Sequence, residues 1–196
     1  DVLIIQGKYQ VQPEMPFVPG GECAGVVKAV GADVSRWQEG DEVIQMGAYG
    51  GFAEEVAVNE NALLPKPSAL TMTEAAGIGI TYFTSYHALV QRANIQPGET
   101  LLVLGAAGGV GSTALELGKA LGAKVIAAVS SDEKLALCKQ LGADEVINYS
   151  TESLKDRVKE LTNGRGVDVV YDPVGGDFSE VAVRSTSHLS PSGIST

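Results

Sequence analysis

The second half of the chain alternates between apolar runs and amphipathic segments. Residues 101–104 and 125–129 are continuously apolar, which is typical of parallel strands covered on both faces. The pattern predicts strands at residues 101–104, 124–129, 145–148 and 168–171, and helices at residues 110–121, 132–141 and 151–161. Such regular alternation predicts βαβ units and a parallel α/β sheet of the Rossmann type.

The first half has a different rhythm. Up to about residue 80 the chain is rich in glycine and proline, and apolar stretches at 26–30, 42–44 and 52–58 predict short strands. Strands this short and this often interrupted favour a small twisted β-barrel. Residues 2–5 are also strand-like, so we expect the chain to start inside the fold of something longer. The change of rhythm predicts two domains, residues 1–80 and 81–196.

The region between the two patterns is helical, and the end of the chain is not regular. Thr73 is a candidate cap for a helix that holds Glu74, and a longer helix is predicted from Thr84 to about Ala93. Residues 184–196 are polar and serine-rich, without a strand pattern. A doubly wound domain has about six strands, so the four predicted strands imply a sheet that is incomplete at its C-terminal end.

Composition and charge exclude several classes of protein. The chain has 24 Asp and Glu against 14 Lys and Arg, and a net charge of -10 disfavours nucleic acid as the main partner. No run approaches the ~18 apolar residues of a membrane span. The two cysteines, Cys23 and Cys138, lie far apart and outside any CxxC pair, which argues against a disulfide framework and fits a reducing compartment. We expect a cytoplasmic protein, or a mitochondrial one if a transit peptide has been removed.

A glycine-rich turn follows the first strand of the second half. It runs Gly105-Ala-Ala-Gly108-Gly109-Val110-Gly111 and opens a helix, which is the context that gives a GxGxxG-like motif its meaning. Gly108 lets the backbone approach a pyrophosphate at the helix start, Gly111 is expected to allow close packing of helix on strand, and Ala106 replaces the first glycine. The alternative is a turn that merely connects strand and helix.

The residues after the second strand bear on which dinucleotide is bound. An NAD site places Asp or Glu there for the ribose 2′-OH, whereas this chain has Ser130 and Ser131, with Lys134 one helical turn later. Hydroxyls and an ammonium group suit a 2′-phosphate, so the pattern favours NADPH. Asp132 and Glu133 blur this interpretation. The alternative is that Ser130 is only a helix N-cap and Lys134 a solvated charge.

At this point the motifs resemble a known family. The segments GAAGGVGSTALELGKALGAKVIAAVSSDEKLALCKQLGADEVINYS, TYFTSYHAL and VVYDPVGGD are similar to the zinc-independent quinone oxidoreductases of the medium-chain dehydrogenase/reductase superfamily. The segment PFVPGGECAGVVKAVGADVSRWQEGDEV resembles the GroES-like catalytic barrel of that superfamily. The resemblance covers residues 1 to about 183 and implies a GroES-like domain followed by a Rossmann domain.

The resemblance implies NADPH-dependent hydride transfer, without zinc, to a quinone or an α,β-unsaturated carbonyl compound. Zinc-dependent relatives carry Gly-His-Glu where this chain has Gly20-Gly21-Glu22. Only His87 and His188 are present, and His87 is expected on a helix surface; no metal site is predicted. Cys23 beside Glu22 is expected to be a core thiol. A homodimer is implied for a full-length form.

Site residues follow from the same resemblance, position by position. It implies that Ala106 to Gly111 hold the pyrophosphate, that Ser130, Ser131 and Lys134 hold the 2′-phosphate, and that Tyr149 lies near the adenosine. It places Thr84 near the nicotinamide and Tyr9 in the substrate cleft. Ile5 stands where relatives often have arginine, which puts an anion contact there in doubt. Each has a simpler interpretation: Tyr9 as an exposed aromatic, Thr84 as a helix cap, and Tyr149 as an aromatic that closes the third strand. Gly175-Gly176 either lines the cofactor or forms a plain turn.

Two other functions remain open at the level of sequence. The same fold serves enoyl-thioester or enone reductases, whose larger acyl channel the sequence does not reveal. A low-turnover NADPH-binding structural or adaptor protein is also possible, since a fold does not dictate a function. Turnover of a small quinone distinguishes an enzyme from an adaptor.

Overall fold

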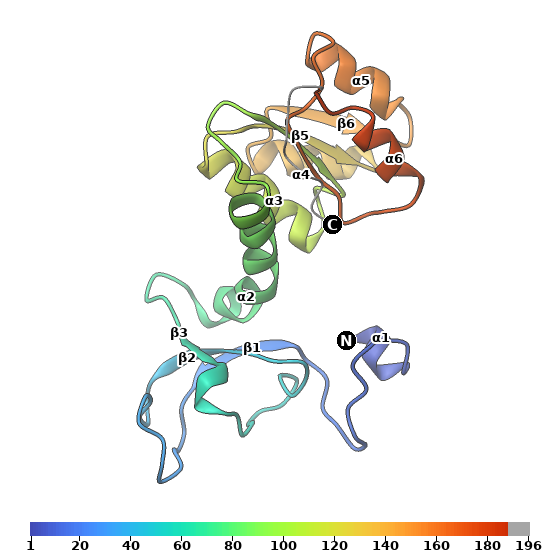
Figure 1. The fold of residues 1–196 in the computed structure, drawn as a ribbon. Helices are drawn as coiled ribbons and strands as arrows, with labels where there is room; N and C mark the ends of the chain where they lie inside the picture. Colours follow the sequence, from blue (N-terminus) through green and yellow to red (C-terminus); the bar gives the residue numbers. More distant parts are fainter. Residues whose placement is uncertain (188–196) are drawn as a thin grey trace. The chain divides into compact units, whose positions relative to one another are not determined.

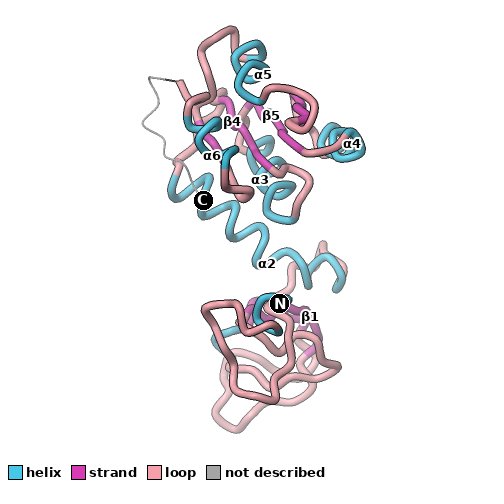
Figure 2. The backbone as a smooth tube through the Cα atoms, turned by 90° about the vertical axis from the view of Figure 1, so that its right-hand side faces the viewer, coloured by secondary structure: helices cyan, strands magenta, loops and turns pink. Residues whose placement is uncertain are grey.

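The computed structural model describes residues 1–187 and divides into two compact units, Asp1–Ile80 and a unit that begins at Thr81. Figure 1 shows the course of the chain and Figure 2 the distribution of helices, strands and loops. Helix α2 (Met72–Tyr86) runs across the division. None of the helices in the described part of the chain is long and apolar enough to cross a membrane.

The second unit is built on a parallel sheet with the strand order β6-β5-β4-β7. The strands are β4 (Thr100–Leu104), β5 (Lys124–Val129), β6 (Glu145–Asn148) and β7 (Val169–Tyr171). The four strands predicted from the sequence are confirmed, with β7 starting one residue later than expected. Val167, just before β7, forms an isolated parallel bridge with Thr186, which lies in the segment 184–196 that shows no strand pattern. The rest of that segment, residues 188–196, lies outside the described residues.

Helices cover both faces of this sheet. The helices are α3 (Gly109–Ala120), α4 (Asp132–Gln140), α5 (Leu154–Leu161) and α6 (Asp177–Val183). Leu101, Val103 and Val125 belong to a core cluster with α3 and α4, while Leu102 and Ile126 belong to one with α5 and α6. Figure 1 shows α5 and α6 side by side. Burial on both faces explains why residues 101–104 of β4 and 125–129 of β5 are continuously apolar.

Two details of the helices differ from the prediction. Helix α5 starts at Leu154 and not at residue 151, because the Ser153 side chain accepts the Asp156 N–H and caps it. Helix α6 was not predicted at all. It follows the two glycines Gly175 and Gly176, both at positive φ, which look like a plain turn in the sequence.

Helix α2 starts with a capping box. The Thr71 hydroxyl accepts the Glu74 N–H at 3.3 Å, and the Glu74 carboxylate accepts the Thr71 N–H at 2.8 Å. The Thr71 backbone and side-chain hydrogen bonds lower the pKa of Glu74. The prediction that Thr73 caps this helix is therefore wrong. The choice between two nearby threonines depends on which of them reaches Glu74 three residues later.

The helix predicted from Thr84 to about Ala93 is confirmed, but its start at Thr84 is wrong. Helix α2 is continuous through Thr84 and passes into a π-helical turn, His87–Arg92. The wider turn is visible in the hydrogen bond from the Ala93 N–H to the Ala88 carbonyl, five residues back. It buries Ala88 and Leu89 in the core of the second unit.

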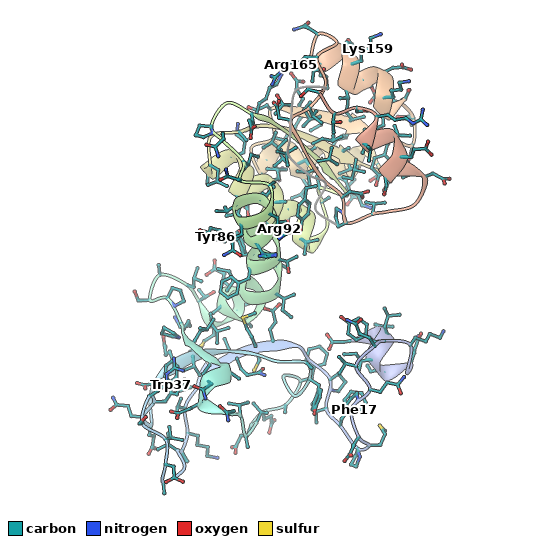
Figure 3. The ribbon with its side chains drawn as sticks, in the orientation of Figure 1. Phe17, Trp37, Tyr86, Arg92, Lys159 and Arg165 are labelled. Carbon is teal, nitrogen blue, oxygen red and sulfur yellow. The ribbon has the colours of Figure 1, made fainter. Side chains whose placement is uncertain are left out.

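The first unit contains one antiparallel sheet in the order β1-β2-β3, formed by Glu22–Val26, Glu42–Met46 and Leu63–Pro65. Strand β1 ends where the predicted strand 26–30 was to begin, because residues 22–26 are the ones that pair with β2. The strand at residues 42–44 is confirmed as part of β2. Trp37 donates its indole N–H to the Glu60 carbonyl of the 3₁₀ turn Glu60–Ala62, which Figure 3 shows beside it. Among the described residues these three strands form an open sheet, whereas the pattern predicts a small twisted β-barrel.

Two further strand predictions in this unit are wrong. Residues 2–5 form a short helix, α1 (Val2–Ile5), and residues 52–58 are loop. A strand needs a neighbouring edge for its N–H and C=O groups, and neither segment pairs with another strand in the described part of the chain. Apolar spacing alone does not reveal whether such an edge is available.

Asp144 joins three elements of the second unit. Its carboxylate accepts the Val125 N–H at 2.6 Å and the Lys119 ammonium at 2.7 and 2.8 Å. Partial burial raises the pKa of this carboxyl group, but the bonds from Lys119 and Val125 outweigh it and leave the pKa below its usual value. The lowered pKa means that the ionised form stabilises the fold.

We expect Asp144→Asn to lower the free energy of unfolding by no more than about 1 kcal/mol at pH 7, because the carboxylate is partly exposed. The loss stems from the lowered pKa of Asp144 in the folded state. It is therefore fully present above the pKa of an aspartate in the unfolded chain, which is near 4, and it fades as pH falls below that pKa. Urea unfolding at pH 7 and pH 3 measures both quantities. Glu180→Gln, which breaks an exposed pair with Arg184, is the control and costs less. An equal loss for Asp144→Asn at both pH values contradicts the assignment.

Candidate functional site

The carboxyl ends of the four parallel strands of the second unit lie at one edge of the sheet. The segments that follow β4, β5, β6 and β7 there are residues 105–111, 130–134, 149–150 and 172–176. In open α/β sheets this edge is where ligands bind. The candidate site of the second unit is therefore made of these four segments.

The turn after β4 requires glycine at two positions. Gly105 has a φ of +59°, which disfavours any residue with a Cβ. A Cβ on Gly111 would lie 2.2 Å from the Gly105 carbonyl oxygen and 2.9 Å from the Ala106 Cα. Gly111 thus lets helix α3 begin directly against the turn. The expected packing of helix on strand instead involves Gly118, where a Cβ would lie 2.7 Å from Leu101 Cδ2.

The start of helix α3 presents backbone donors. Gly108 is the N-cap residue, its N–H donates to the Gly105 carbonyl, and its own carbonyl accepts the Ser112 N–H. The N–H groups of the first turn of any helix have no acceptor within that helix. Gly108 and Gly109 are exposed and Val110 is half-buried, so an anion can approach these donors. Ala106 is fully buried in the core, and its N–H donates to the Ala128 carbonyl.

A buried hydroxyl network supports this turn from behind. Ser85 Oγ lies 2.9 Å from the Val110 carbonyl, 2.8 Å from Thr113 Oγ1 and 3.1 Å from the Tyr171 hydroxyl. The network ties helix α2 to α3 and β7. Sequence reasoning missed these residues, since one small polar residue in an apolar helix carries no distinctive signal.

A second contact between α2 and α3 lies beside the network. The Tyr82 hydroxyl donates to the Glu116 carboxylate. This hydrogen bond, with burial and the negative charge of Glu116, raises the pKa of Tyr82 to about 12. The phenol therefore stays protonated at neutral pH and holds the two helices together.

The structure brings Ser130 and Lys134 together after β5. The Lys134 ammonium donates to Ser130 Oγ at 3.2 Å, and both side chains are exposed. The Ser130 carbonyl accepts the Ser150 hydroxyl at 3.0 Å, which links the ends of β5 and β6. Helix α4 has Ser131 and not Ser130 at its N-cap. The arrangement leaves an exposed hydroxyl and a cation side by side at the edge of the sheet.

Tyr149 and Asp172 directly follow the two outer strands of the sheet, β6 and β7. The Tyr149 ring packs on Phe178 of α6, with ring centroids 4.5 Å apart. Asp172, which sequence reasoning missed, is buried and accepts the N–H groups of Val174 and Gly175 and the Ser179 hydroxyl. It shapes the turn after β7 and the start of α6. The only feature of the sequence that could have indicated this role of Asp172 is its position directly after a strand.

The two residues proposed for catalysis belong to different units. Tyr9 is 41% exposed and lines a cavity of about 750 Å³ in the first unit, together with apolar side chains such as Leu3, Phe52 and Ile80. Glu22 lines the same cavity, and its carboxylate accepts the Ile80 N–H at 2.9 Å. Thr84 belongs to the second unit, exposed within α2, so the interpretation of Thr84 as a helix cap is wrong.

The candidate metal ligands lie apart from one another. His87 is exposed on the helix surface, as expected, with Nδ1 2.6 Å from Gln91 Oε1. Cys23 is half-buried beside Gln45, and burial raises the pKa of its thiol. His188 lies outside the described residues. Within residues 1–187, no group of three or more His, Cys, Asp or Glu side chains is placed to hold a metal ion.

We expect Gly111→Ala to lower the free energy of unfolding by about 3 kcal/mol, because its Cβ meets backbone atoms that cannot move aside. Gly109→Ala is the matched control in the same turn, since its Cβ would meet only the Thr81 methyl group at 3.3 Å. Urea unfolding of the two variants measures the difference. Equal stability of the two variants is incompatible with a contact between turn and helix at Gly111.

Family models match both parts of the chain. Residues 1–68 match the model of the alcohol dehydrogenase GroES-like domain, and residues 109–189 match the model named zinc-binding dehydrogenase. A quinone oxidoreductase-like protein 2 homolog of Nematostella vectensis is 46% identical over 94% of this chain and 51% of its own length. The chain therefore spans about half the length of the curated relatives that it matches.

Solved structures give the same result. The Escherichia coli quinone oxidoreductase complexed with NADPH is 36% identical, with a TM-score of 0.87 over 95% of this chain and 57% of that chain. The CurK enoyl reductase is 31% identical, with a TM-score of 0.82 over 95% of this chain and 56% of that chain. The chain belongs to the medium-chain dehydrogenase/reductase superfamily, with a GroES-like domain followed by a Rossmann domain, and its relatives include proteins named quinone oxidoreductases.

Proposed function

We propose that the protein is an NADPH-dependent oxidoreductase that reduces a quinone or an α,β-unsaturated carbonyl compound without zinc. One observation carries the proposal: a glycine turn that opens helix α3 stands at the same sheet edge as the exposed Ser130–Lys134 pair. The first suits a pyrophosphate and the second a 2′-phosphate. The NADPH complex of the similar Escherichia coli enzyme supports the choice of cofactor.

The residues present fit this cofactor. Gly108 and Gly109 leave the start of α3 open to a pyrophosphate, where backbone N–H groups from Gly109 to Gly111 would hold it. Ser130, Ser131 and Lys134 would hold the 2′-phosphate, and Tyr149 would lie near the adenosine. Bound NADPH supplies a hydride at its nicotinamide ring.

The remaining roles fall to side chains that orient and polarise the acceptor. We assign to the Tyr9 hydroxyl a hydrogen bond to the acceptor oxygen, and to Thr84 a position near the nicotinamide. Donors placed where negative charge develops lower the barrier. A conjugated acceptor needs less activation than a simple ketone, so hydrogen bonds suffice where zinc-dependent relatives use a metal. Glycine at position 21, and the Glu22 carboxylate bonded to the Ile80 N–H, support the proposal that zinc is not used.

A second candidate is reduction of an enoyl thioester or enone on the same scaffold. The structural similarity to the CurK enoyl reductase favours it. Relative kcat/KM values for a small quinone and a short enoyl thioester decide between the two. Tight NADPH binding without turnover of either compound indicates instead a structural or adaptor protein.

The oligomeric state, the cellular location and the class of partner are also proposals. A homodimer is proposed for a longer form of the chain, and a cytoplasmic or mitochondrial location fits the unpaired cysteines. The net charge of -10 supports a small-molecule substrate in preference to nucleic acid.

We expect Lys134→Ala to weaken NADPH binding about tenfold while NADH binding stays the same, because only NADPH carries the 2′-phosphate. Titration of the purified chain with each cofactor, followed by nicotinamide fluorescence, gives both dissociation constants. Lys139→Ala, an exposed lysine further along the same helix, is the control. Equal affinities of the unaltered chain for NADPH and NADH would overturn the 2′-phosphate assignment.

We expect Tyr9→Phe to lower kcat/KM for a small quinone about tenfold and to leave NADPH affinity unchanged, because it removes a donor to the acceptor alone. Steady-state reduction of the quinone by NADPH measures the first, and fluorescence titration the second. Tyr49→Phe is the matched control, since Tyr49 is exposed in the same unit but does not line the cavity of Tyr9. A normal rate for Tyr9→Phe contradicts its role.

A further inference from the structure

Asp132, like the neighbouring Glu133, disagrees with a 2′-phosphate site at the end of β5. It is exposed, it follows Ser130 and Ser131 directly, and it opens helix α4. A carboxylate near this strand end is what an NAD site uses to accept the ribose 2′-OH, and it would repel a 2′-phosphate. The position of its charge therefore bears on which cofactor is preferred.

The structure shows a specific partner for this carboxylate. Asn148 Nδ2 donates to Asp132 Oδ1 at 2.7 Å. Asn148 is the last residue of β6 and pairs in register with Val129, the residue before Ser130. It is only 4% exposed, so its amide approaches Asp132 from inside the sheet edge.

The orientation of the Asn148 amide is determined by its other end. Asn148 Oδ1 accepts the Ser150 N–H at 3.1 Å, and a backbone N–H can only donate. The amide nitrogen is therefore the atom that faces Asp132. The backbone N–H of Asn148 donates to Glu152, and its carbonyl accepts the N–H groups of Thr151 and Glu152, so the residue is held on every side.

The charged group that contacts Ser130 is the Lys134 ammonium, which donates a hydrogen bond to the serine hydroxyl. The dipole of helix α4 also stabilises the Asp132 carboxylate in this position, because Asp132 is the first residue of the helix. Asn148 thus separates two opposite charges that lie two residues apart in sequence. The carboxylate is engaged at the end of β6, and the ammonium group is engaged at Ser130.

We propose that Asn148 is a specificity-determining residue that acts by positioning: it holds the Asp132 carboxylate at the end of β6, so that Asp132 does not oppose a 2′-phosphate at Ser130 and Lys134. The proposal deepens the proposed function and rests on its choice of NADPH. It explains how a chain with an acid after β5 can still prefer the phosphorylated cofactor. The residue need not touch the cofactor.

The test is the ratio of dissociation constants for NADPH and NADH. We expect Asn148→Ala to reduce the preference for NADPH about tenfold, because the released carboxylate disfavours a 2′-phosphate and accepts a 2′-OH. The double variant Asn148→Ala/Asp132→Ala should restore the preference. Nicotinamide fluorescence gives both constants, and urea unfolding reports stability separately.

A second pair of variants avoids the buried position. Asp132→Glu lengthens the side chain past the Asn148 amide and should also reduce the preference for NADPH, whereas Asp132→Asn keeps an acceptor without charge and should maintain or increase it. Both changes are at an exposed residue, so folding is not at risk.

The outcomes distinguish a wrong cofactor from a wrong role for Asn148. If the unaltered chain binds both cofactors equally, the proposed function has the wrong cofactor. If the chain prefers NADPH but Asn148→Ala and Asp132→Glu lower the affinities for NADPH and NADH by the same factor, Asn148 is only structural and the inference is overturned. A change in the ratio, with rescue by the double variant, supports it.

Discussion

The contact between the backbones of Gly105 and Gly111 is the constraint on which the second unit depends. Helix α3 can start so close to the end of β4 only because Gly111 carries no Cβ, while Gly105 adopts a φ of +59° that favours glycine. This close start points the free N–H groups of the helix at the edge of the sheet, where β5 and β6 also end. The same contact therefore shapes the fold and creates the place where an anion can bind.

Side chains around the turn hold this geometry in different ways. Behind it, Ser85, Thr113 and Tyr171 satisfy one another in a buried site, where an unpaired hydroxyl would be costly. At the edge of the sheet, Asn148 donates a hydrogen bond to Asp132, and Lys134 donates one to Ser130. The first group is buried and uncharged, whereas the second includes the charges of Asp132 and Lys134, so only the second bears on the choice between cofactors.

The two units differ in how much they bury. The second unit encloses its apolar strands between two layers of helices, and residues such as Leu101, Leu102 and Ile126 are fully buried. In the described part of the first unit, the buried apolar side chains are Val43, Ile44, Leu63 and Ala75, while Phe52 and Val26 are more than half exposed. Burial of apolar surface is the main force that stabilises a fold, so it contributes more to the stability of the second unit than to that of the first.

The sequence by itself determined the parallel sheet, its four strands and the glycine turn, because continuous apolar runs and glycines at strict positions are local signals. It also named Ser130 and Lys134, which lie one helical turn apart and so meet through local geometry alone. It failed at residues 2–5 and 52–58, where an apolar pattern lacks a partner strand, and at the start of α2, where Thr71 and not Thr73 reaches Glu74. Only the tertiary structure decided that Asn148 meets Asp132 and that Ser85 meets Tyr171. Those pairs lie 16 and 86 residues apart, and nothing local encodes a contact that the pairing of strands and the packing of helices bring about.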